Sequence, residues 1–142
     1  MSMPGRSPEP LLDVRGLRVA FGAREVVHGI DFAVAAGEKL AIVGESGSGK
    51  TVTASSLLRL LPQARVSGSA RLAGQDLLAL SETQLQGVRG RDVAMIFQEP
   101  MTALNPLLTV GAQIAEVVQL KQGVDKRTAW AQAVELLART GI

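Results

Sequence analysis

A glycine-rich stretch followed by a lysine and a threonine is the first feature of this sequence whose residue types and spacing could do chemistry. It reads VGESGSGKT and spans residues 43–51. Gly44, Gly49, Lys50 and Thr51 follow the spacing G-x-x-x-x-G-K-[ST], in which backbone amides turn inward around phosphate oxygens. The lysine would contact the β- and γ-phosphates, and the threonine hydroxyl would ligate Mg²⁺. The spacing predicts a site for a nucleoside triphosphate.

The alternative is a glycine turn that merely joins a strand to a helix. Such a turn needs one or two glycines, whereas this stretch has three, with a lysine and a hydroxyl directly after them. We therefore favour phosphate binding. The residues predicted to bind the nucleotide here are Gly44, Glu45, Ser46, Gly47, Ser48, Gly49, Lys50 and Thr51.

The segments on either side of this stretch should position it. Residues 39–43 (KLAIV) are short and apolar on consecutive positions, which is typical of a strand buried on both faces. Residues 50–61 predict a helix that ends before Pro62. The side chains expected to face a sheet are Val52, Leu57, Leu60 and Leu61.

The N-terminal part predicts an antiparallel hairpin. Residues 11–21 and 26–34 both alternate between apolar and polar side chains. The alternation slips at Gly16, where a β-bulge is the simple explanation.

Further elements follow the glycine-rich stretch. We expect a strand around Ala70, and a short helix from Ser81 because Gln84 has the capping-box spacing. Residues 92–97 (DVAMIF) predict a second buried strand, and residues 98–106 a loop. Two helices should complete the chain. Their expected apolar stripes are Val110, Ile114, Val117 and Val118, then Trp130, Val134 and Leu137.

Composition limits the classes of protein. The chain has 142 residues, a net charge of +2 and no cysteine. The charge is too small to indicate a nucleic acid partner, and thiolate metal sites are excluded. No apolar run has the roughly 18 residues of a membrane span, and residues 1–10 resemble a disordered tail rather than a secretory signal.

Two segments together resemble a known family. IVGESGSGKT (42–51) and MIFQEPMTALNP (95–106) are similar to the Walker A and Q-loop segments of the ATPase subunits of ATP-binding cassette (ABC) transporters. More narrowly, they resemble the ATPases of bacterial oligopeptide, dipeptide and nickel importers. The resemblance runs over residues 11–142. It implies an α/β fold with a P-loop NTPase core, an N-terminal antiparallel β subdomain and the start of a C-terminal helical subdomain. The implied division is 11–106 for the β subdomain and core, and 107–142 for the helical part.

The resemblance also implies roles for single residues. Phe21 falls where an aromatic ring stacks on adenine, although a plain core position is the alternative. Gln98 falls at the Q-loop glutamine, which assists catalysis together with Lys50 and contacts Mg²⁺ or the attacking water. Glu99 could be mistaken for a catalytic carboxylate. The first polar residue after the predicted strand is Gln98, however, and its amide cannot act as a base.

The chain is expected to stop short of the family's signature motif. No match to that motif, to the Walker B acid or to the switch histidine is found in the sequence. Because hydrolysis needs a base that activates water, we expect the 142 residues to bind Mg²⁺-ATP weakly and not to hydrolyse it appreciably alone.

The expected function is that of the ATP-binding, energy-coupling subunit of an ABC importer for peptides or a related small solute. The alternative is a truncated nucleotide-binding fragment that does not hydrolyse ATP. Expected partners are integral permease subunits, a second ATPase subunit and, indirectly, an extracytoplasmic solute-binding protein, at the cytoplasmic face of the inner membrane. A P-loop kinase lacks support, since no acceptor site or arginine-rich lid is seen. A DNA-repair ATPase would usually show zinc-binding cysteines or heptads.

Overall fold

The structure is a computed structural model that describes residues 9–99 and 102–142. Most of the predicted tail (1–10) and two residues of the Q-loop segment therefore lie outside the described residues. The chain forms two compact units, Met1–Leu85 and Gln86–Ile142, and each is described by itself below.

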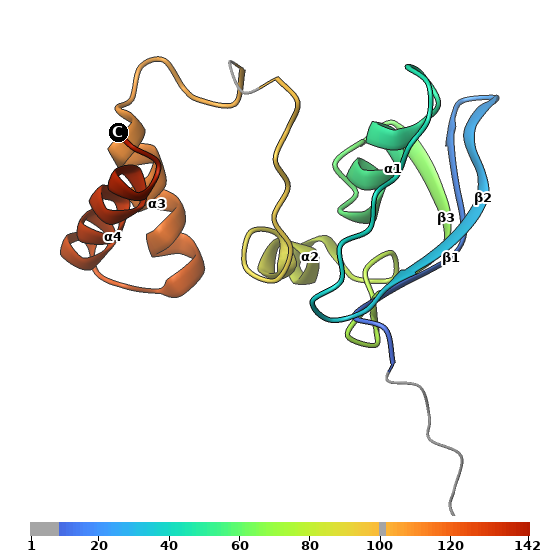
Figure 1. Ribbon diagram of the computed structural model, residues 1–142, viewed down its shortest axis with the longest axis horizontal. Helices are drawn as coiled ribbons and strands as arrows, with labels where there is room; N and C mark the ends of the chain where they lie inside the picture. Colours follow the sequence, from blue (N-terminus) through green and yellow to red (C-terminus); the bar gives the residue numbers. More distant parts are fainter. Residues whose placement is uncertain (1–8, 100–101) are drawn as a thin grey trace, which may run out of the picture. The chain divides into compact units, whose positions relative to one another are not determined.

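The first unit is built on a four-stranded antiparallel sheet (Figure 1). The predicted hairpin is confirmed as β1 (Leu12–Phe21) and β2 (Arg24–Val34). The strand expected around Ala70 is β3 (Ala64–Leu72), which pairs with β1 and with the short β4 (Gln75–Asp76). The order across the sheet is β2-β1-β3-β4.

The predicted β-bulge lies where two strands shift register together. The pairing of β1 with β2 shifts between Val14 and Leu17, on either side of Gly16, whose φ is 55°. The Gly16 amide donates to the Asp31 carboxylate at 2.5 Å, which satisfies a donor that leaves the ladder. In β3, Gly68 has a φ of 99°, and a Cβ there would lie 2.5 Å from the Gly16 carbonyl oxygen. The bulge is thus confirmed, and it depends on a glycine from each strand.

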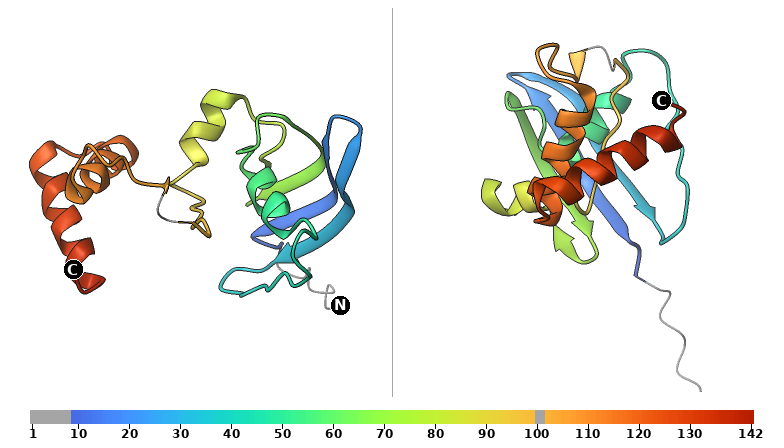
Figure 2. Two further views of the ribbon diagram at one scale, coloured as in Figure 1. Left: turned by 90° about the horizontal axis from the view of Figure 1, so that it is seen from above. Right: turned by 90° about the vertical axis from the view of Figure 1, so that its left-hand side faces the viewer.

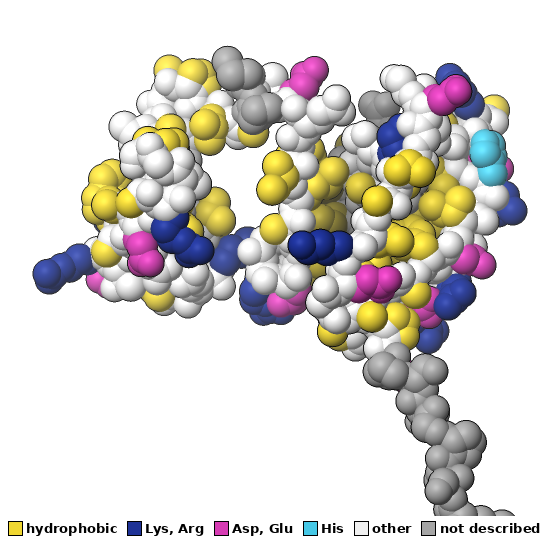
Figure 3. Space-filling view, viewed as in Figure 1, with side chains coloured by type: hydrophobic (Ala, Val, Ile, Leu, Met, Phe, Trp, Pro, Cys, Tyr) yellow, Lys and Arg dark blue, Asp and Glu magenta, His cyan; other side chains and the backbone are white. Residues whose placement is uncertain are grey.

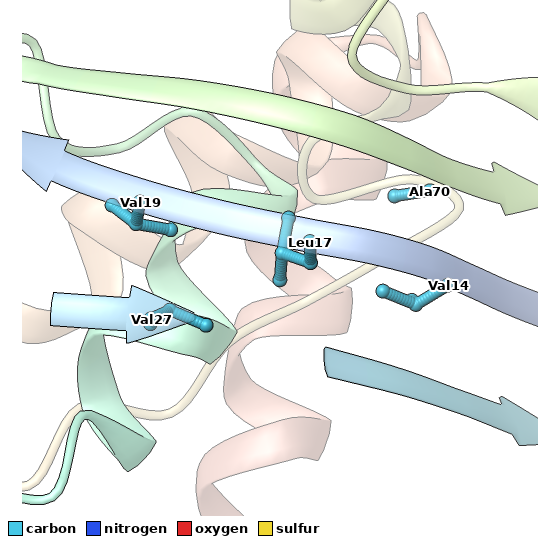
Figure 4. Packing of buried hydrophobic residues seen from close by; sticks show 5 residues of the cluster. All are labelled: Val14, Leu17, Val19, Val27 and Ala70. Atoms are coloured by element: carbon cyan, nitrogen blue, oxygen red, sulfur yellow. The ribbon is translucent and has the colours of Figure 1, made fainter. Parts of the chain in front are cut away.

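A small aliphatic core lies on one face of this sheet. Its buried members are Val14, Leu17, Val19, Val27 and Ala70 (Figure 4). Helix α1 (Lys50–Leu57) packs on the same cluster through partly buried side chains that include Val52 and Leu57, and it contacts β1, β2 and β3. Figure 2 shows α1 against one face of the sheet. The helix that follows the glycine-rich stretch is thereby fixed to a rigid support.

Two predicted strands are wrong. Residues 39–43 and 92–97 form no named strand, and only an isolated bridge between Arg89 and Val93 touches the second segment. Both predictions assumed strands buried on two faces, yet Val43 is 88% and Ile96 is 98% exposed. A parallel strand forms only when neighbouring strands satisfy its amides and carbonyls. Within residues 9–99 and 102–142, the named sheet pairs neither segment with a neighbour.

The helix predicted over 50–61 is shorter than expected. It ends at Leu57, and Arg59 adopts a positive φ of 49°. The Arg59 guanidinium donates to the Leu80 carbonyl at 2.6 Å and to the Glu82 carboxylate at 3.2 Å. These bonds join the end of α1 to the start of α2 (Glu82–Val88).

The predicted capping box of α2 is confirmed. The Ser81 amide donates to the Gln84 side-chain oxygen at 2.9 Å, and the Gln84 amide donates to the Ser81 hydroxyl at 3.3 Å. Both donors are satisfied reciprocally, as the spacing predicted.

The second unit contains a pair of helices. They are α3 (Val110–Gln122) and α4 (Lys126–Arg139), capped by side chains of Thr109 and Asp125. Gly123 ends α3 in a left-handed conformation. Of the helices seen in residues 9–99 and 102–142, none has the length and apolar content needed to cross a membrane.

The predicted apolar stripes of these helices are only partly right. Val118 is buried and Ile114 partly buried, but Val117, Trp130 and Val134 are half exposed. The buried side chains at the contact are instead small: Ala115, Ala129 and Ala133. Alanines let the helices approach closely, and the larger side chains then lie beside the contact rather than in it. Trp130 itself covers Gly111, where a Cβ would lie 3.2 Å from the indole ring.

Candidate functional site

Three glycines shape the loop that leads into α1. Gly47 and Gly49 have φ of 81° and 91°, which is left-handed backbone that other residues rarely adopt. A Cβ on Gly49 would also lie 3.3 Å from the Val26 carbonyl oxygen of β2. A Cβ on Gly44 would lie 2.6 Å from the Ser48 hydroxyl. The loop therefore turns tightly and lies close to β2. Both features require glycine, because a side chain at these positions would collide with neighbouring atoms or strain the backbone.

The N-terminus of α1 presents donors and positive potential. Gly49 is its N-cap and supplies no side-chain cap, and no acidic residue lies in the first turn. The first amides of a helix lack partners within the helix, and the helix dipole adds about half a positive charge there. This arrangement suits a phosphate group.

The Lys50 ammonium lies inside the loop. Its Nζ donates to the carbonyl oxygens of Gly44 and Glu45, both at 2.7 Å, and to the Ser48 hydroxyl at 3.3 Å. The lysine and the loop therefore fix each other. A positive charge is held at the loop rather than extended into solvent.

A groove of about 270 Å³ runs beside the loop. Its residues come from β2, from the segment before the loop, from the loop and from α1: Val26, Val27, His28, Ile30, Ile42, Val43, Gly44, Ser48, Gly49, Lys50 and Thr53. The lining thus combines polar and cationic groups of the loop with aliphatic side chains. This combination fits a ligand with an anionic tail and a less polar body.

Charged groups also surround His28 on β2. The Arg18 guanidinium donates to Glu25 at 3.0 Å, and His28 Nδ1 lies 3.1 Å from the same carboxylate. These two contacts, the arginine first, lower the pKa of Glu25. The carboxylate is thereby kept ionised by its own neighbours, and it lies on the strand that lines the groove.

The predicted metal ligands are Thr51 and Gln98. Thr51 is exposed in the first turn of α1, next to Lys50. In the described part of the chain, no group of three or more His, Cys, Asp or Glu side chains could hold a metal ion. A Mg²⁺ ion here would need most of its oxygen ligands from a bound nucleotide and from water, which is the usual manner in which Mg²⁺ is held. The hydroxyl fits that role.

Gln98 and Phe21 are the predicted site residues that lie outside the loop in sequence. Gln98 is exposed in the second unit, where it lines a hollow with Phe97, Glu99, Thr102 and Ala103. Its contact with a metal or water at the loop stays a prediction. Phe21 ends β1 and is partly buried against the sheet core. Adenine stacking by this ring stays a prediction.

Sequence reasoning missed the wall of the groove. Val26, Ile30 and Thr53 line it, and none of them belongs to the glycine-rich pattern. The alternation of residues 26–34 did predict a strand. Which strand approaches the loop depends on how α1 packs on the sheet, and no local pattern carries that information.

The model of the family described as ABC transporter matches residues 27–142. A Brucella melitensis protein named as a peptide import ATP-binding protein is 46% identical over 96% of this chain. The peptidoglycan transport ATP-binding protein of Agrobacterium fabrum is 48% identical over 99% of this chain. The chain spans 44% of the first relative and 27% of the second.

A solved structure is similar as well. It is that of a bacterial Atm1-family ABC exporter with ATP bound, with a TM-score of 0.53 and 29% identity. The match covers 77% of this chain and 18% of that chain.

Proposed function

Because this chain belongs to the ABC transporter family, we propose that its first unit binds ATP and that it is part of the energy-coupling subunit of an importer. The observation that carries the proposal is the Lys50 ammonium, held by two loop carbonyls at 2.7 Å beside the uncapped start of α1. That geometry offers a fixed positive charge and free amides together. A nucleotide tail needs both.

We assign the phosphate groups to the loop from Gly44 to Thr51. Backbone amides there would cradle the phosphates, with Lys50 neutralising their charge. The hydroxyl of Thr51 would be one ligand of Mg²⁺, and Gln98 would supply a second or orient a water molecule. The metal would neutralise charge on the phosphates, and the protein's contribution is to hold the oxygen ligands in place.

The adenine ring would stack on Phe21. Phe keeps the π-face that stacking needs. The aliphatic wall formed by Val26 and Ile30 would then contact the less polar part of the nucleotide. The contact with that wall is supported by the groove, whose lining residues also include Lys50.

The transported solute is proposed from the relatives' names. Peptide import is in the name of one relative and peptidoglycan transport in that of another, so we propose peptides or a related small solute. The whole protein would lie at the cytoplasmic face of the inner membrane, against integral permease subunits, and pair with a second ATPase subunit. An extracytoplasmic solute-binding protein would select the cargo.

A titration of the chain with a fluorescent ATP analogue in the presence of Mg²⁺ tests nucleotide binding. Saturable binding is expected, with affinity lowered about tenfold or more in Lys50→Ala, because a charge-assisted contact to phosphate is lost. Lys126→Ala removes an exposed lysine on α4 and is the control, with unchanged affinity expected. Equal affinity of Lys50→Ala and the original chain would contradict the proposal.

Release of phosphate should be measured in the same samples. We expect little turnover from this chain, since the Gln98 side chain is an amide and cannot take a proton from water. A turnover that disappears in Lys50→Ala would show that the chain hydrolyses ATP and would reject the non-hydrolysing alternative.

A further inference from the structure

We propose that Ser48 is a positioning residue for Lys50: its hydroxyl keeps one N–H of the lysine ammonium directed along the loop, at the place where a phosphate oxygen would take it over. The inference rests on the proposed nucleotide function. It adds a role for a side chain at a position where the glycine-rich pattern specifies no residue type.

The first support is the count of donors and acceptors. A lysine ammonium has three N–H donors and no acceptor. Three protein oxygens surround the Lys50 Nζ: two main-chain carbonyls at 2.7 Å and the Ser48 hydroxyl at 3.3 Å. All three donors are therefore used, and the serine bond is the longest. A phosphate oxygen would replace that bond more easily than either carbonyl bond.

The second support is that the loop holds the hydroxyl in place. The Ser48 amide donates to the Glu45 carbonyl at 3.2 Å, which closes the turn. The hydroxyl lies against Gly44, only 2.6 Å from the position that a Cβ on that glycine would take. A hydroxyl confined by a turn and a neighbouring backbone is a fixed acceptor rather than a freely rotating one.

The third support is the position of these groups at the groove. Gly44, Ser48 and Lys50 all line it. The exchange of one N–H from the serine to a phosphate oxygen would therefore occur at the groove and needs little motion of the lysine. Pre-organisation of this kind raises affinity because less side-chain freedom is lost on binding.

Without the hydroxyl, two protein oxygens instead of three hold the ammonium before ATP binds. More side-chain freedom is then lost on binding, so Ser48→Ala should weaken ATP binding about two- to tenfold, the cost of ordering one side chain. Ser48→Thr keeps the hydroxyl and should lose less affinity than Ser48→Ala. Ser67→Ala, on the exposed part of β3, is the matched serine control and should leave the affinity unchanged.

A double-mutant cycle separates positioning from mere loop packing. If Ser48 acts through the ammonium, Ser48→Ala should cause no further loss in a Lys50→Met background. A packing role would give the same loss in both backgrounds. Affinities of all four combinations are measured with the fluorescent ATP analogue, after circular dichroism has shown that each variant is folded.

A second readout needs no nucleotide. In ¹⁵N-labelled chain, the Lys50 ammonium should show faster motion and faster proton exchange with water in Ser48→Ala than in the original chain. If the alanine variant does not fold, Ser48→Cys is used, because sulfur is a weak acceptor of similar size.

The outcomes are distinguishable. Unchanged ATP affinity in Ser48→Ala, or an equal loss in the Lys50→Met background, overturns the role of Ser48 while ATP binding stands. Absence of saturable binding by the original chain overturns the proposed function and this inference together. An unchanged ammonium signal in Ser48→Ala also overturns the inference.

Discussion

At the scale of single residues, the loop depends on glycines, because they have no Cβ. Gly44 leaves space for the Ser48 hydroxyl, Gly47 and Gly49 take left-handed backbone, and Gly49 also allows β2 to approach. Lys50 then has carbonyls of its own loop as partners. In the pattern G-x-x-x-x-G-K-T, the glycines thus allow the tight backbone turn that surrounds the lysine ammonium.

Gly44→Ala tests whether the loop needs a residue without a side chain at this position. Its Cβ would lie 2.6 Å from the Ser48 hydroxyl and 3.3 Å from the Ser48 Cβ, so the loop must shift. We expect ATP affinity to fall tenfold or more, because small displacements in a positioned site have large effects. Binding is measured by the fluorescence titration.

Gly87→Ala is the matched control for that substitution. Gly87 lies in α2, and its added Cβ would meet no atom within 4 Å. The control should bind ATP like the original chain. A Gly44→Ala variant with full affinity would show that the loop tolerates a side chain there.

At the scale of elements, the sheet and the helices are fixed by local features that the sequence contains. The double bulge of β1 and β3 is built from Gly16 and Gly68, and α2, α3 and α4 each begin at a capping side chain. Such features can be changed one at a time, and each gives a stability prediction.

Gly68→Ala should destabilise the first unit strongly. The added Cβ would lie 2.5 Å from the Gly16 carbonyl oxygen and 2.7 Å from that of Arg15, both backbone atoms, and φ is 99°. We expect a loss of about 3 kcal/mol or more of the free energy of unfolding, from backbone strain and overpacking together. Urea unfolding followed by circular dichroism measures it.

Gly74→Ala is the control that measures the effect of backbone strain without a steric contact. Gly74 also has a positive φ of 84°, but its Cβ would meet nothing within 4 Å. A loss of about 1 kcal/mol is expected. If the two variants were equally stable, the contact between the bulges would contribute nothing.

Asp125 should make the start of α4 sensitive to acid. Its pKa lies below the ordinary value because the carboxylate accepts hydrogen bonds from the Thr128 side chain and amide. Since the folded pKa is lower than the unfolded one, the stabilisation is present above the unfolded pKa and is lost as pH falls through the folded pKa. The protection of the Ala129 and Trp130 amides, measured relative to their intrinsic exchange rates, should therefore fall as pH drops below about 4.

Asp125→Asn is the control for this prediction. Asparagine also caps helices but has no charge to titrate, so the protection of these amides should lose its acid dependence. Equal acid dependence in the two chains would assign the effect to another group.

At the scale of the whole molecule, apolar surface remains uncovered. Figure 3 shows hydrophobic side chains on the face in view. Exposed apolar side chains occur in both units, among them Val43, Ile96, Leu107 and Leu120. Large exposed apolar patches favour association. Segments 39–43 and 92–97 add strand-like sequence in which most apolar side chains are exposed to solvent.

We expect the 142-residue chain to self-associate at micromolar concentration. Replacing Ile96 with Lys puts a charge on a side chain that is 98% exposed and should shift the distribution toward monomer. Analytical ultracentrifugation measures the change. Ala138→Lys adds the same charge at an exposed position of α4 and should have little effect. A monodisperse original chain with cooperative unfolding would contradict the expectation.

The sequence alone determined the loop, the hairpin with its bulge and the caps, because each depends on neighbouring residues of particular types. The spacing of Gly49 and Lys50 predicts a phosphate site, and the spacing of Ser81 and Gln84 predicts the start of a helix. Tertiary structure decided the rest. Whether residues 39–43 form a strand depends on hydrogen-bond partners elsewhere, and whether Trp130 or Ala129 is buried depends on how closely two helices approach. The aliphatic wall beside Lys50 comes from β2, which is brought there by the packing of α1 on the sheet.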